Sequence, residues 1–338
     1  MNLGAVILRL ERYFTKMIFR EYNLLLTKFK NHLLSQRLMV KISVIGAGNL
    51  GSSIAYEIAN RAIADEIVLI DILQDLAEGQ AADIQQALPF KNKTQIYSGN
   101  YEKVGGSDII ILTAGKPRTP DIKDRLQLAE INIKIVKFII QEIKKYSSQS
   151  VIITLTNPMD IINHFIYKNG FSRNKVIGSG GQLDSARLKV VLGFPEKEAE
   201  AFVLGEHGDN QVSVFSQIRI NGQMKYFSEN EQKEIQQKIK ESALNVIVKK
   251  GATIFAPASA TADMVEAIVK NQHKILICSA NLQGEYGITD VSVGVPCILG
   301  KNGIEKIEEW NLDVSELQQL QEAGRKLKEI YGMATKSI

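Results

Sequence analysis

The chain has 338 residues, of which 45% are hydrophobic and 23% are charged, a composition typical of a globular protein. Its net charge of +4 arises in residues 1–38, which carry seven basic and two acidic side chains and leave 34 basic and 35 acidic residues in the remainder. The body of the chain therefore lacks the excess of basic residues that is typical of nucleic-acid-binding proteins. The spacing of Cys278 and Cys297 favours two buried thiols over a metal site.

Residues 1–38 are basic and loosely amphipathic, with no apolar run near the roughly 20 residues of a membrane span. Arg9, Arg12 and Lys16 interrupt the apolar stretch that a signal peptide needs. Three interpretations of this segment are open. It results from a start site placed upstream of a true first residue at Met39, it is an organellar transit peptide, or it is a partner-binding helix. We favour the first, because a strand follows Met39 directly, and we expect a cytoplasmic protein. A transit peptide would instead place it in the mitochondrial matrix.

Strands and helices alternate in the first half of the chain. Short apolar runs predict buried strands at 40–45, 66–70, 94–98, 108–113 and 151–155, and helical patterns lie at 49–61, 73–87 and 125–146. This order predicts an α/β fold with a Rossmann-type, doubly wound parallel sheet. We assign residues 39–180 to this domain.

The rhythm changes beyond residue 180. Helices are predicted at 184–191, 228–249, 256–270 and 315–331, and strands at 201–204, 211–220, 274–279 and 291–298. Glycine-containing turns between these strands indicate an antiparallel or mixed sheet. We therefore expect residues 181–338 to form an α+β catalytic domain that shares a broad interface with the first.

A glycine-rich loop joins the first strand to the first helix, with the sequence Gly46-Ala47-Gly48-Asn49-Leu50-Gly51. Gly46 allows a tight turn, Gly48 lets a pyrophosphate approach the backbone, and Gly51 lets the helix pack on the sheet. The phosphates would face the helix N-terminus. A lone match is weak evidence, but here the strand and helix context is the one that a dinucleotide site requires.

An acidic residue ends the second strand. Asp71 lies 20 residues after Gly51, where a carboxylate can accept hydrogen bonds from the adenosine ribose. Its charge opposes a 2′-phosphate, so we expect NAD as the cofactor. Thr113-Ala114-Gly115 follows the fourth strand, and its small residues would let the cofactor lie across the sheet edge.

His207 is the candidate proton carrier. It follows a predicted strand between two glycines, whereas His164 and His273 lie in unremarkable helical contexts. Asp184 and Arg187 are three positions apart and would share one helix face. That face can offer a carboxylate to His207 and a guanidinium to a substrate, but an ordinary ion pair explains the spacing equally well.

Two further segments are candidates. Asn157 follows the strand 151–155, at the sheet edge where ligands bind, whereas Asp160 is interpreted as a possible cap of the next helix. Residues 116–125 form a polar loop with two prolines, which suits a lid that carries Arg118 and Arg125 into the site. A solvated charged loop is the alternative.

Together these motifs resemble the lactate/malate dehydrogenase superfamily from about residue 40 to residue 331. The glycine loop with Asp71 is followed, in family order, by Thr-Asn-Pro-x-Asp, Leu-Asp-Ser-Ala-Arg and Gly-Glu-His-Gly-Asp at 156–160, 183–187 and 205–209.

The resemblance implies a role for each site residue. It implies that His207 is the acid/base paired with Asp184, that Arg187 binds the C1 carboxylate, and that Arg125 polarises the C2 carbonyl. Asn157 would contact both substrate and cofactor.

Asn132 keeps the family's spacing to Arg125, and we count it among the cofactor-binding residues. Arg118 stands where the malate type has arginine and the lactate type usually has glutamine. The resemblance therefore implies malate and oxaloacetate as substrates. Six residues separate Arg118 from Arg125, one more than the family loop usually has.

Several alternatives are open. An L-lactate or broad 2-hydroxyacid dehydrogenase is the runner-up. An NAD- and metal-dependent glycosidase would need a Cys/His cluster, and a non-catalytic NAD-binding protein would have no reason to carry His207, Asp184, Arg187 and Arg125 together. We expect a small-molecule substrate, a homo-oligomer (dimer or tetramer), and neither nucleic acid nor a membrane as partner.

Overall fold

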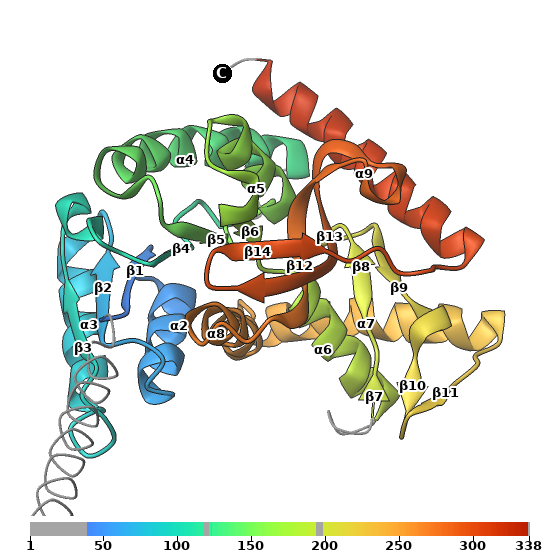
Figure 1. Ribbon diagram of the computed structural model, residues 1–338, viewed down its shortest axis with the longest axis horizontal. Coiled ribbons are helices and arrows are strands. Elements are labelled where there is room, and N and C mark those ends of the chain that lie inside the picture. The colour runs from blue at the N-terminus through green and yellow to red at the C-terminus, as the bar shows by residue number, and fades with distance from the viewer. Residues whose placement is uncertain (1–38, 118–121, 123, 194–198, 337–338) are drawn as a thin grey trace, which may run out of the picture. The chain divides into compact units, whose positions relative to one another are not determined.

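The computed structural model describes residues 39–117, 122, 124–193 and 199–336 (Figure 1). The described residues from 40 onward form one compact unit, to which the following description applies. The predicted loop residue Arg118 lies outside the described residues.

A parallel sheet forms the first half of this unit. Its strands are β1 (Lys41–Ile45), β2 (Glu66–Ile70), β3 (Gln95–Ser98), β4 (Ile109–Leu112), β5 (Val151–Thr154) and β6 (Val176–Gly178). They lie in the order β3-β2-β1-β4-β5-β6, and each pairs in parallel with its neighbours. The predicted doubly wound sheet is therefore confirmed. The order reverses at β1 and β4, which places a ligand-binding crevice at the carboxyl ends of these strands.

Among the described residues, α-helices connect most of these strands. They are α2 (Asn49–Asn60), α3 (Gln74–Gln86), α4 (Arg125–Ser147) and α5 (Met159–Lys168). Asp124 caps α4, since its carboxylate accepts a hydrogen bond of 2.9 Å from the main-chain nitrogen of Gln127. The cap fixes Arg125 as the first residue of the helix, at the end of the loop predicted to close over the site.

The second half continues the same sheet. Its helices are α6 (Gly181–Leu192), α7 (Glu229–Lys250), α8 (Phe255–Val269) and α9 (Val314–Thr335). Its strands are β7 (Ala199–Glu200), β8 (Val203–Gly205), β9 (Gln211–Ser213), β10 (Arg219–Ile220), β11 (Gln223–Met224), β12 (Lys274–Gln283), β13 (Thr289–Gly300) and β14 (Gly303–Ile307). β12 pairs antiparallel with both β6 and β13, and β8 pairs with β13, so the predicted mixed sheet is confirmed as an extension of the parallel one.

The prediction of one strand over residues 211–220 is wrong. A 3-10 turn at Phe215–Gln217 separates β9 from β10, and β10 joins β7 and β11 in a separate small sheet. Phe215 and Ile218 are buried in a second apolar cluster with Ile239 of α7. Packing of these two side chains against α7 turns the chain out of the main sheet.

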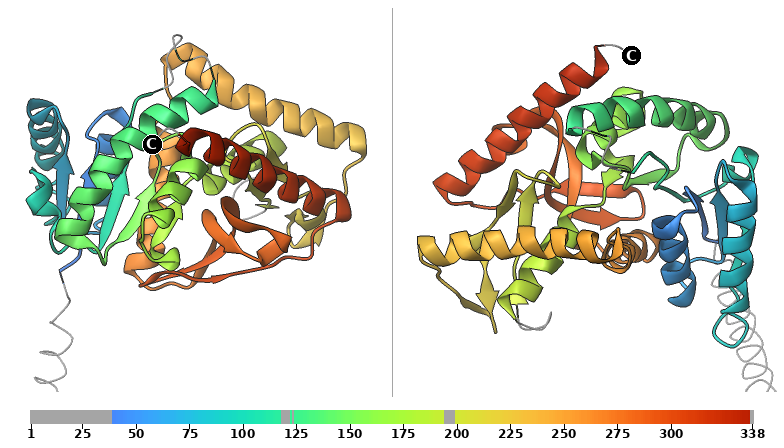
Figure 2. Two further views of the ribbon diagram at one scale, coloured as in Figure 1. Left: turned by 90° about the horizontal axis from the view of Figure 1, so that it is seen from above. Right: turned by 180° about the vertical axis from the view of Figure 1, so that it is seen from behind.

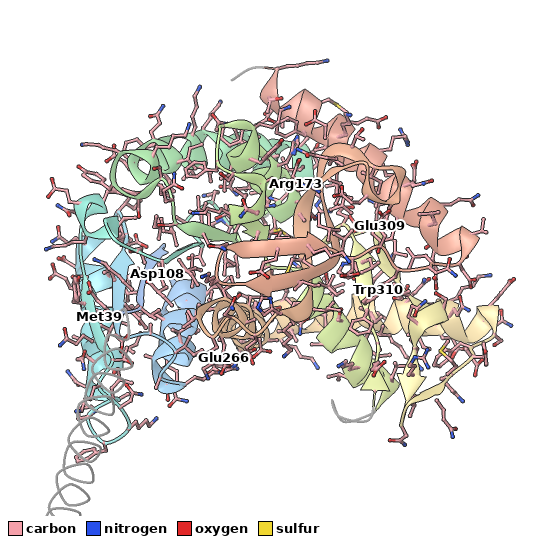
Figure 3. The ribbon with its side chains drawn as sticks, in the orientation of Figure 1. Met39, Asp108, Arg173, Glu266, Glu309 and Trp310 are labelled. Carbon is pink, nitrogen blue, oxygen red and sulfur yellow. The ribbon has the colours of Figure 1, made fainter. Side chains whose placement is uncertain are left out.

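Contacts between distant segments hold the two halves together. α9 packs against α4, α5 and β13 (Figure 2), and α2 packs against α8. Arg173 (Figure 3) donates a hydrogen bond of 2.6 Å to the main-chain oxygen of Asn281 and forms an ion pair with Glu285. These contacts fix the carboxyl ends of the parallel strands relative to β8 and α6, which carry the candidate catalytic residues.

Within the described residues, no single helix has the length and apolar composition of a membrane span. α7 and α8 meet these criteria only when taken as a pair, which is bent by 116° at its break.

Candidate active site

The glycine loop turns tightly between β1 and α2. Gly46 has φ of +104°, and a Cβ atom built there would lie 2.6 Å from the main-chain nitrogen of Ala114. A Cβ at Gly51 would lie 1.8 Å from the main-chain oxygen of Gly46. Side chains at either position would collide with the backbone, so the close turn and the close helix contact both require glycine.

The space in front of the loop is open. A Cβ built at Gly48 would have no neighbour within 4 Å among the described atoms, and no side chain of the described residues caps the N-terminus of α2. The main-chain N–H groups of Asn49 and Leu50, at the start of α2, are thus available to bind an anion. Such a site suits a pyrophosphate.

Asp71 lies beside this loop at the end of β2. One carboxylate oxygen accepts a hydrogen bond of 2.7 Å from the nitrogen of Ala47, and the other accepts one of 3.0 Å from the nitrogen of Leu73. A carboxylate oxygen can accept more than one hydrogen bond, so ribose hydroxyls still have lone pairs to bind. Together with the open space at Gly48, this donor and acceptor set fits a dinucleotide.

The turns after β4 and β5 form the next part of the edge. Thr113 donates a hydrogen bond of 2.8 Å to the oxygen of Gly46, and the Thr156 hydroxyl donates one of 2.8 Å to the oxygen of Ala114. Gly115 is in close contact with Thr156, since a Cβ built at position 115 would lie 2.5 Å from Cγ2 of that threonine. These bonds hold the small-residue segment 113–115 against the glycine loop.

Asn132 clamps the same two turns from α4. Its side chain accepts a hydrogen bond of 2.7 Å from the nitrogen of Lys116 and donates bonds to the main-chain oxygens of Lys116 and Asn157, at 3.0 Å and 2.6 Å. It is only 1% exposed, whereas Asn157 is exposed at the edge. The contacts make Asn132 a support for these turns, and direct contact with a cofactor stays a prediction.

His207, Asp184 and Arg187 come together as the sequence suggested. Nδ1 of His207 lies 2.7 Å from Oδ2 of Asp184, and Nη1 of Arg187 donates to Oδ1 of the same carboxylate at 2.9 Å. α6 begins at Gly181, three residues before the predicted start, so Asp184 lies within its first turn. One buried carboxylate therefore orients both the imidazole and the guanidinium, and the alternative of an isolated ion pair is excluded.

The surroundings of His207 favour its protonated form. Burial lowers the pKa of His207, whereas the charge and hydrogen bond of Asp184 and the charge of Asp160 raise it. Arg187 opposes them. The net effect raises the pKa of His207 above its ordinary value, which suits a group that must hold and then release a proton near neutral pH.

Arg125 also reaches the His207 loop. Nη2 of Arg125 donates a hydrogen bond of 2.8 Å to the main-chain oxygen of His207, and the guanidinium forms an ion pair with Glu206, which is 3% exposed. Gly208 makes room for it, because a Cβ there would lie 2.2 Å from Nη1 of Arg125. Glu206 and Gly208 belong to the Gly-Glu-His-Gly-Asp motif, but no local sequence pattern predicts a role for either residue.

Asp160 does not cap α5, so that interpretation is wrong. The cap position is Pro158, and Asp160 lies in the first turn with its Oδ2 accepting a hydrogen bond of 2.8 Å from the main-chain nitrogen of His207. Burial raises the pKa of Asp160. The carboxylate turns inward because it meets an N–H group from a loop that is distant in the sequence, which local pattern could not reveal.

The fold and the site define a nucleotide-dependent dehydrogenase, and comparison with known proteins agrees. Residues 40–178 match the lactate/malate dehydrogenase NAD binding domain, and residues 181–337 match the lactate/malate dehydrogenase alpha/beta C-terminal domain. The chain belongs to the lactate/malate dehydrogenase family, and NAD is its cofactor.

Relatives of both substrate types are similar to this chain. It is 42% identical to the malate dehydrogenase of Haloferax volcanii over 301 residues, covering 87% of this chain and 99% of the relative. It is 39% identical to the L-lactate dehydrogenase of Acetivibrio thermocellus, covering 88% and 98%. The structure of Archaeoglobus fulgidus malate dehydrogenase in complex with NADH has a TM-score of 0.80 at 37% identity, covering 87% and 99%. The chain is thus an NAD-dependent hydroxyacid dehydrogenase.

Proposed function

We propose that this enzyme is a malate dehydrogenase, which reversibly converts malate and NAD to oxaloacetate, NADH and a proton. The observation that carries the chemistry is the shared carboxylate of Asp184, bonded at 2.7 Å to His207 and at 2.9 Å to Arg187. It pairs a proton carrier with a carboxylate-binding group, and α6, which carries both Asp184 and Arg187, follows the carboxyl end of β6.

His207 carries the proton. Because Nδ1 is held by Asp184, Nε2 is the ring nitrogen that can give a proton to the C2 oxygen of oxaloacetate or take one from the hydroxyl of malate. Asp184 fixes the ring orientation and stabilises the imidazolium. NAD, when bound, accepts the hydride from C2 of malate or returns it to C2 of oxaloacetate.

Arginines hold the substrate in this scheme. Arg187 presents its guanidinium to the C1 carboxylate, for which a planar fork is the best match. Arg125 stabilises negative charge that develops on the C2 oxygen during reduction. Arg118 pairs with the second carboxylate of oxaloacetate, which pyruvate lacks, so a desolvated Arg118 disfavours pyruvate.

The substrate is tested by steady-state kinetics with oxaloacetate and pyruvate on the wild type and on Arg118→Gln. A buried charge pair contributes roughly 2–5 kcal/mol when one partner is truncated. We therefore expect kcat/KM for oxaloacetate to exceed that for pyruvate by at least about a hundredfold. The variant should lose oxaloacetate activity and gain pyruvate activity. Equal efficiency in the wild type, or an unchanged ratio in the variant, would refute the malate assignment.

Lactate dehydrogenase is the second candidate. The similarity to the Acetivibrio thermocellus enzyme, at 39% identity, supports it. In that case pyruvate would be the better substrate of the wild type in the same comparison.

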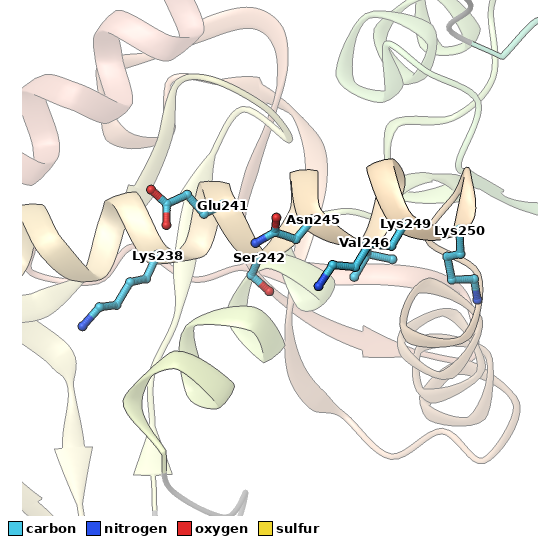
Figure 4. Close-up of a pocket in the computed structure, with 7 residues that line it drawn as sticks. All are labelled: Lys238, Glu241, Ser242, Asn245, Val246, Lys249 and Lys250. Atoms are coloured by element: carbon cyan, nitrogen blue, oxygen red, sulfur yellow. The ribbon is translucent and has the colours of Figure 1, made fainter.

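We also propose that the chain forms a homo-oligomer through the outer face of α7. Of the α7 residues, all of which are described, only Ile239 is buried. Leu244 and Val248 are one helical turn apart and 60% and 75% exposed. The pocket along this helix (Figure 4) is lined by Lys249 and Lys250 among others, and by no residue of the candidate active site.

Exposed apolar side chains at helical spacing favour association with another apolar face. Sedimentation equilibrium should give a dimer or tetramer for the wild type and a smaller species for Val248→Glu. A monomeric wild type would contradict this proposal.

We propose a cytoplasmic location, with the mitochondrial matrix as the alternative. Subcellular fractionation of the source cells with an activity assay tests it, and enrichment of the enzyme in an organelle or membrane fraction would contradict it.

A further inference from the structure

A second carboxylate, that of Asp160, contacts the main chain of His207. Asp160, in the first turn of α5, is 2% exposed. Its Oδ2 accepts the 2.8 Å hydrogen bond from the nitrogen of His207. Burial raises the pKa of this carboxyl group, whereas the neighbouring Ser279 hydroxyl and the N–H of His207 lower it. Burial of a charged carboxylate destabilises a fold, so an asparagine, which can also accept the N–H of His207, would serve a purely structural purpose better.

The main chain of His207 is held at both of its polar groups. Asp160 accepts its N–H, and Arg125 donates to its carbonyl oxygen at 2.8 Å. The loop that carries the imidazole is therefore fixed by α5 on one side and by α4 on the other. With its main chain fixed in this way, His207 has its imidazole within hydrogen-bonding distance of Asp184 from α6.

Several charged groups surround His207. α6 contributes Asp184 and Arg187, α5 contributes Asp160, and α4 contributes Arg125, which is itself paired with Glu206 next to the histidine. Arg125 and Glu206 largely offset one another, as do Arg187 and one of the two aspartates. The balance of charge at the ring thus depends on the presence of both Asp184 and Asp160.

We propose that Asp160 is a positioning residue for proton transfer, which anchors the main chain of His207 and adds a second negative charge that favours the imidazolium. The inference deepens the proposed function and rests on His207 as the proton carrier. An opposite charge within about 4–6 Å favours the charged form of an ionisable group. Asp184 orients the ring through Nδ1, and Asp160 acts on His207 through its main-chain N–H and through its charge.

The test separates charge from anchoring. Asp160→Asn keeps a carbonyl oxygen that can accept the N–H of His207 but removes the charge. The titration of His207 is followed by NMR with ¹³C-labelled histidine in the intact protein without substrate. We expect the midpoint to fall by roughly one pH unit, which is a tenfold loss of proton affinity. A shift below about 0.2 unit, close to the change expected for a distant surface charge, would overturn the proposal.

Asp65→Asn is the matched control. Asp65 accepts a main-chain hydrogen bond of 2.9 Å, from the nitrogen of Val40, but lies at the opposite ends of the strands from the site. This variant should leave the His207 midpoint unchanged. A shift equal to that of Asp160→Asn would show that the effect comes from the loss of any carboxylate bonded to the main chain and would also overturn the proposal.

A second measurement needs no substitution. If Asp160→Asn fails to fold, ¹³C-carboxyl labelling of aspartate in the wild type should show the Asp160 signal inflecting at the His207 midpoint, because coupled groups sense each other's titration. A flat signal would overturn the inference. These titrations involve no substrate, so their failure is distinct from failure of the wild type to reduce oxaloacetate, which would refute the proposed function instead.

Discussion

Gly180 lies directly against the imidazole of His207. A Cβ atom at position 180 would lie 2.7 Å from Cγ of His207 and 2.8 Å from its Cβ. Gly180 precedes α6, the helix that carries Asp184, so the same turn places the carboxylate and leaves room for the ring that it orients. The site thus depends on a missing side chain as much as on those present.

Gly180→Ala should reduce turnover. The added methyl group would push the ring of His207 away from Asp184 and lengthen their hydrogen bond. We expect kcat to fall at least about tenfold, a loss typical of a misplaced catalytic group, while NADH binding stays normal. Stopped-flow turnover and fluorescence titration of NADH measure the two effects. Gly79→Ala, in the exposed middle of α3, is the control and should keep full activity, since a Cβ there has no described neighbour within 4 Å.

His207→Asn should keep NADH binding and lose most of kcat. General acid–base groups typically contribute about a hundredfold to ten-thousandfold to the rate, and asparagine cannot carry the proton. Single-turnover kinetics with oxaloacetate and a binding titration check the two expectations. Near-normal turnover would show that another group is the proton carrier.

The pH dependence of oxaloacetate reduction should follow His207. Reduction needs the protonated ring, so kcat/KM should be constant at low pH and fall as pH rises through the His207 pKa, which is raised above its ordinary value. Malate oxidation needs the neutral ring and should rise over the same range. Asp184→Asn removes the attraction that raises this pKa, so both midpoints should move to lower pH. If the midpoints of both pH profiles stay where they are in Asp184→Asn, a group other than His207 controls the pH dependence.

The local features of the site could be predicted from the sequence because each is short in range. The glycine loop, Asp71 and the Asp184–Arg187 pair all follow from spacing along one turn, strand end or helix face. The residues that hold these features in place could not be predicted. Asp160 meets His207 across 47 residues of chain, and Arg125 meets Glu206 across 81. Such contacts depend on how α5, α4 and β8 pack, which no local pattern reports.

The same limit explains the errors in the fold. Alternating apolar residues over 211–220 indicate one strand, yet burial of Phe215 and Ile218 against α7 divides it. The strands β6 and β14, of three and five residues, were not predicted. In contrast, the long helices α4 and α7 were located within a residue or two at each end.

Asp71→Ser should weaken the preference for NADH over NADPH. The carboxylate lies beside the glycine loop, 2.7 Å from the nitrogen of Ala47, and its charge opposes a 2′-phosphate. We expect the ratio of kcat/KM for the two cofactors to narrow by at least about tenfold, the equivalent of 1.4 kcal/mol. Asp75→Ser, in the first turn of α3, is the control and should leave the ratio unchanged. A wild type that already uses both cofactors equally would contradict the role of Asp71.

The last prediction concerns stability and rests on His164 of α5, which takes no part in the site. Its side chain is 2% exposed, contacts the amide of Asn281 through Nδ1 at 2.7 Å, and packs edge-on against Tyr331. Burial lowers the pKa of His164 to about 4, and although Asp290 favours its protonation, Lys168 and Lys328 oppose it. The folded protein therefore holds this histidine neutral.

Because the folded pKa lies below the ordinary value of 6.5, the unfolded chain binds the proton more tightly. Stability from His164 is complete above pH 6.5 and is lost as pH falls from there toward 4. Between pH 7 and pH 5 the free energy of unfolding should fall by about 2 kcal/mol from this residue. Urea denaturation at several pH values measures the slope. His164→Gln should remove that part of the slope while lowering stability at pH 7. A slope equal in His164→Gln and the wild type would show that His164 does not titrate on unfolding.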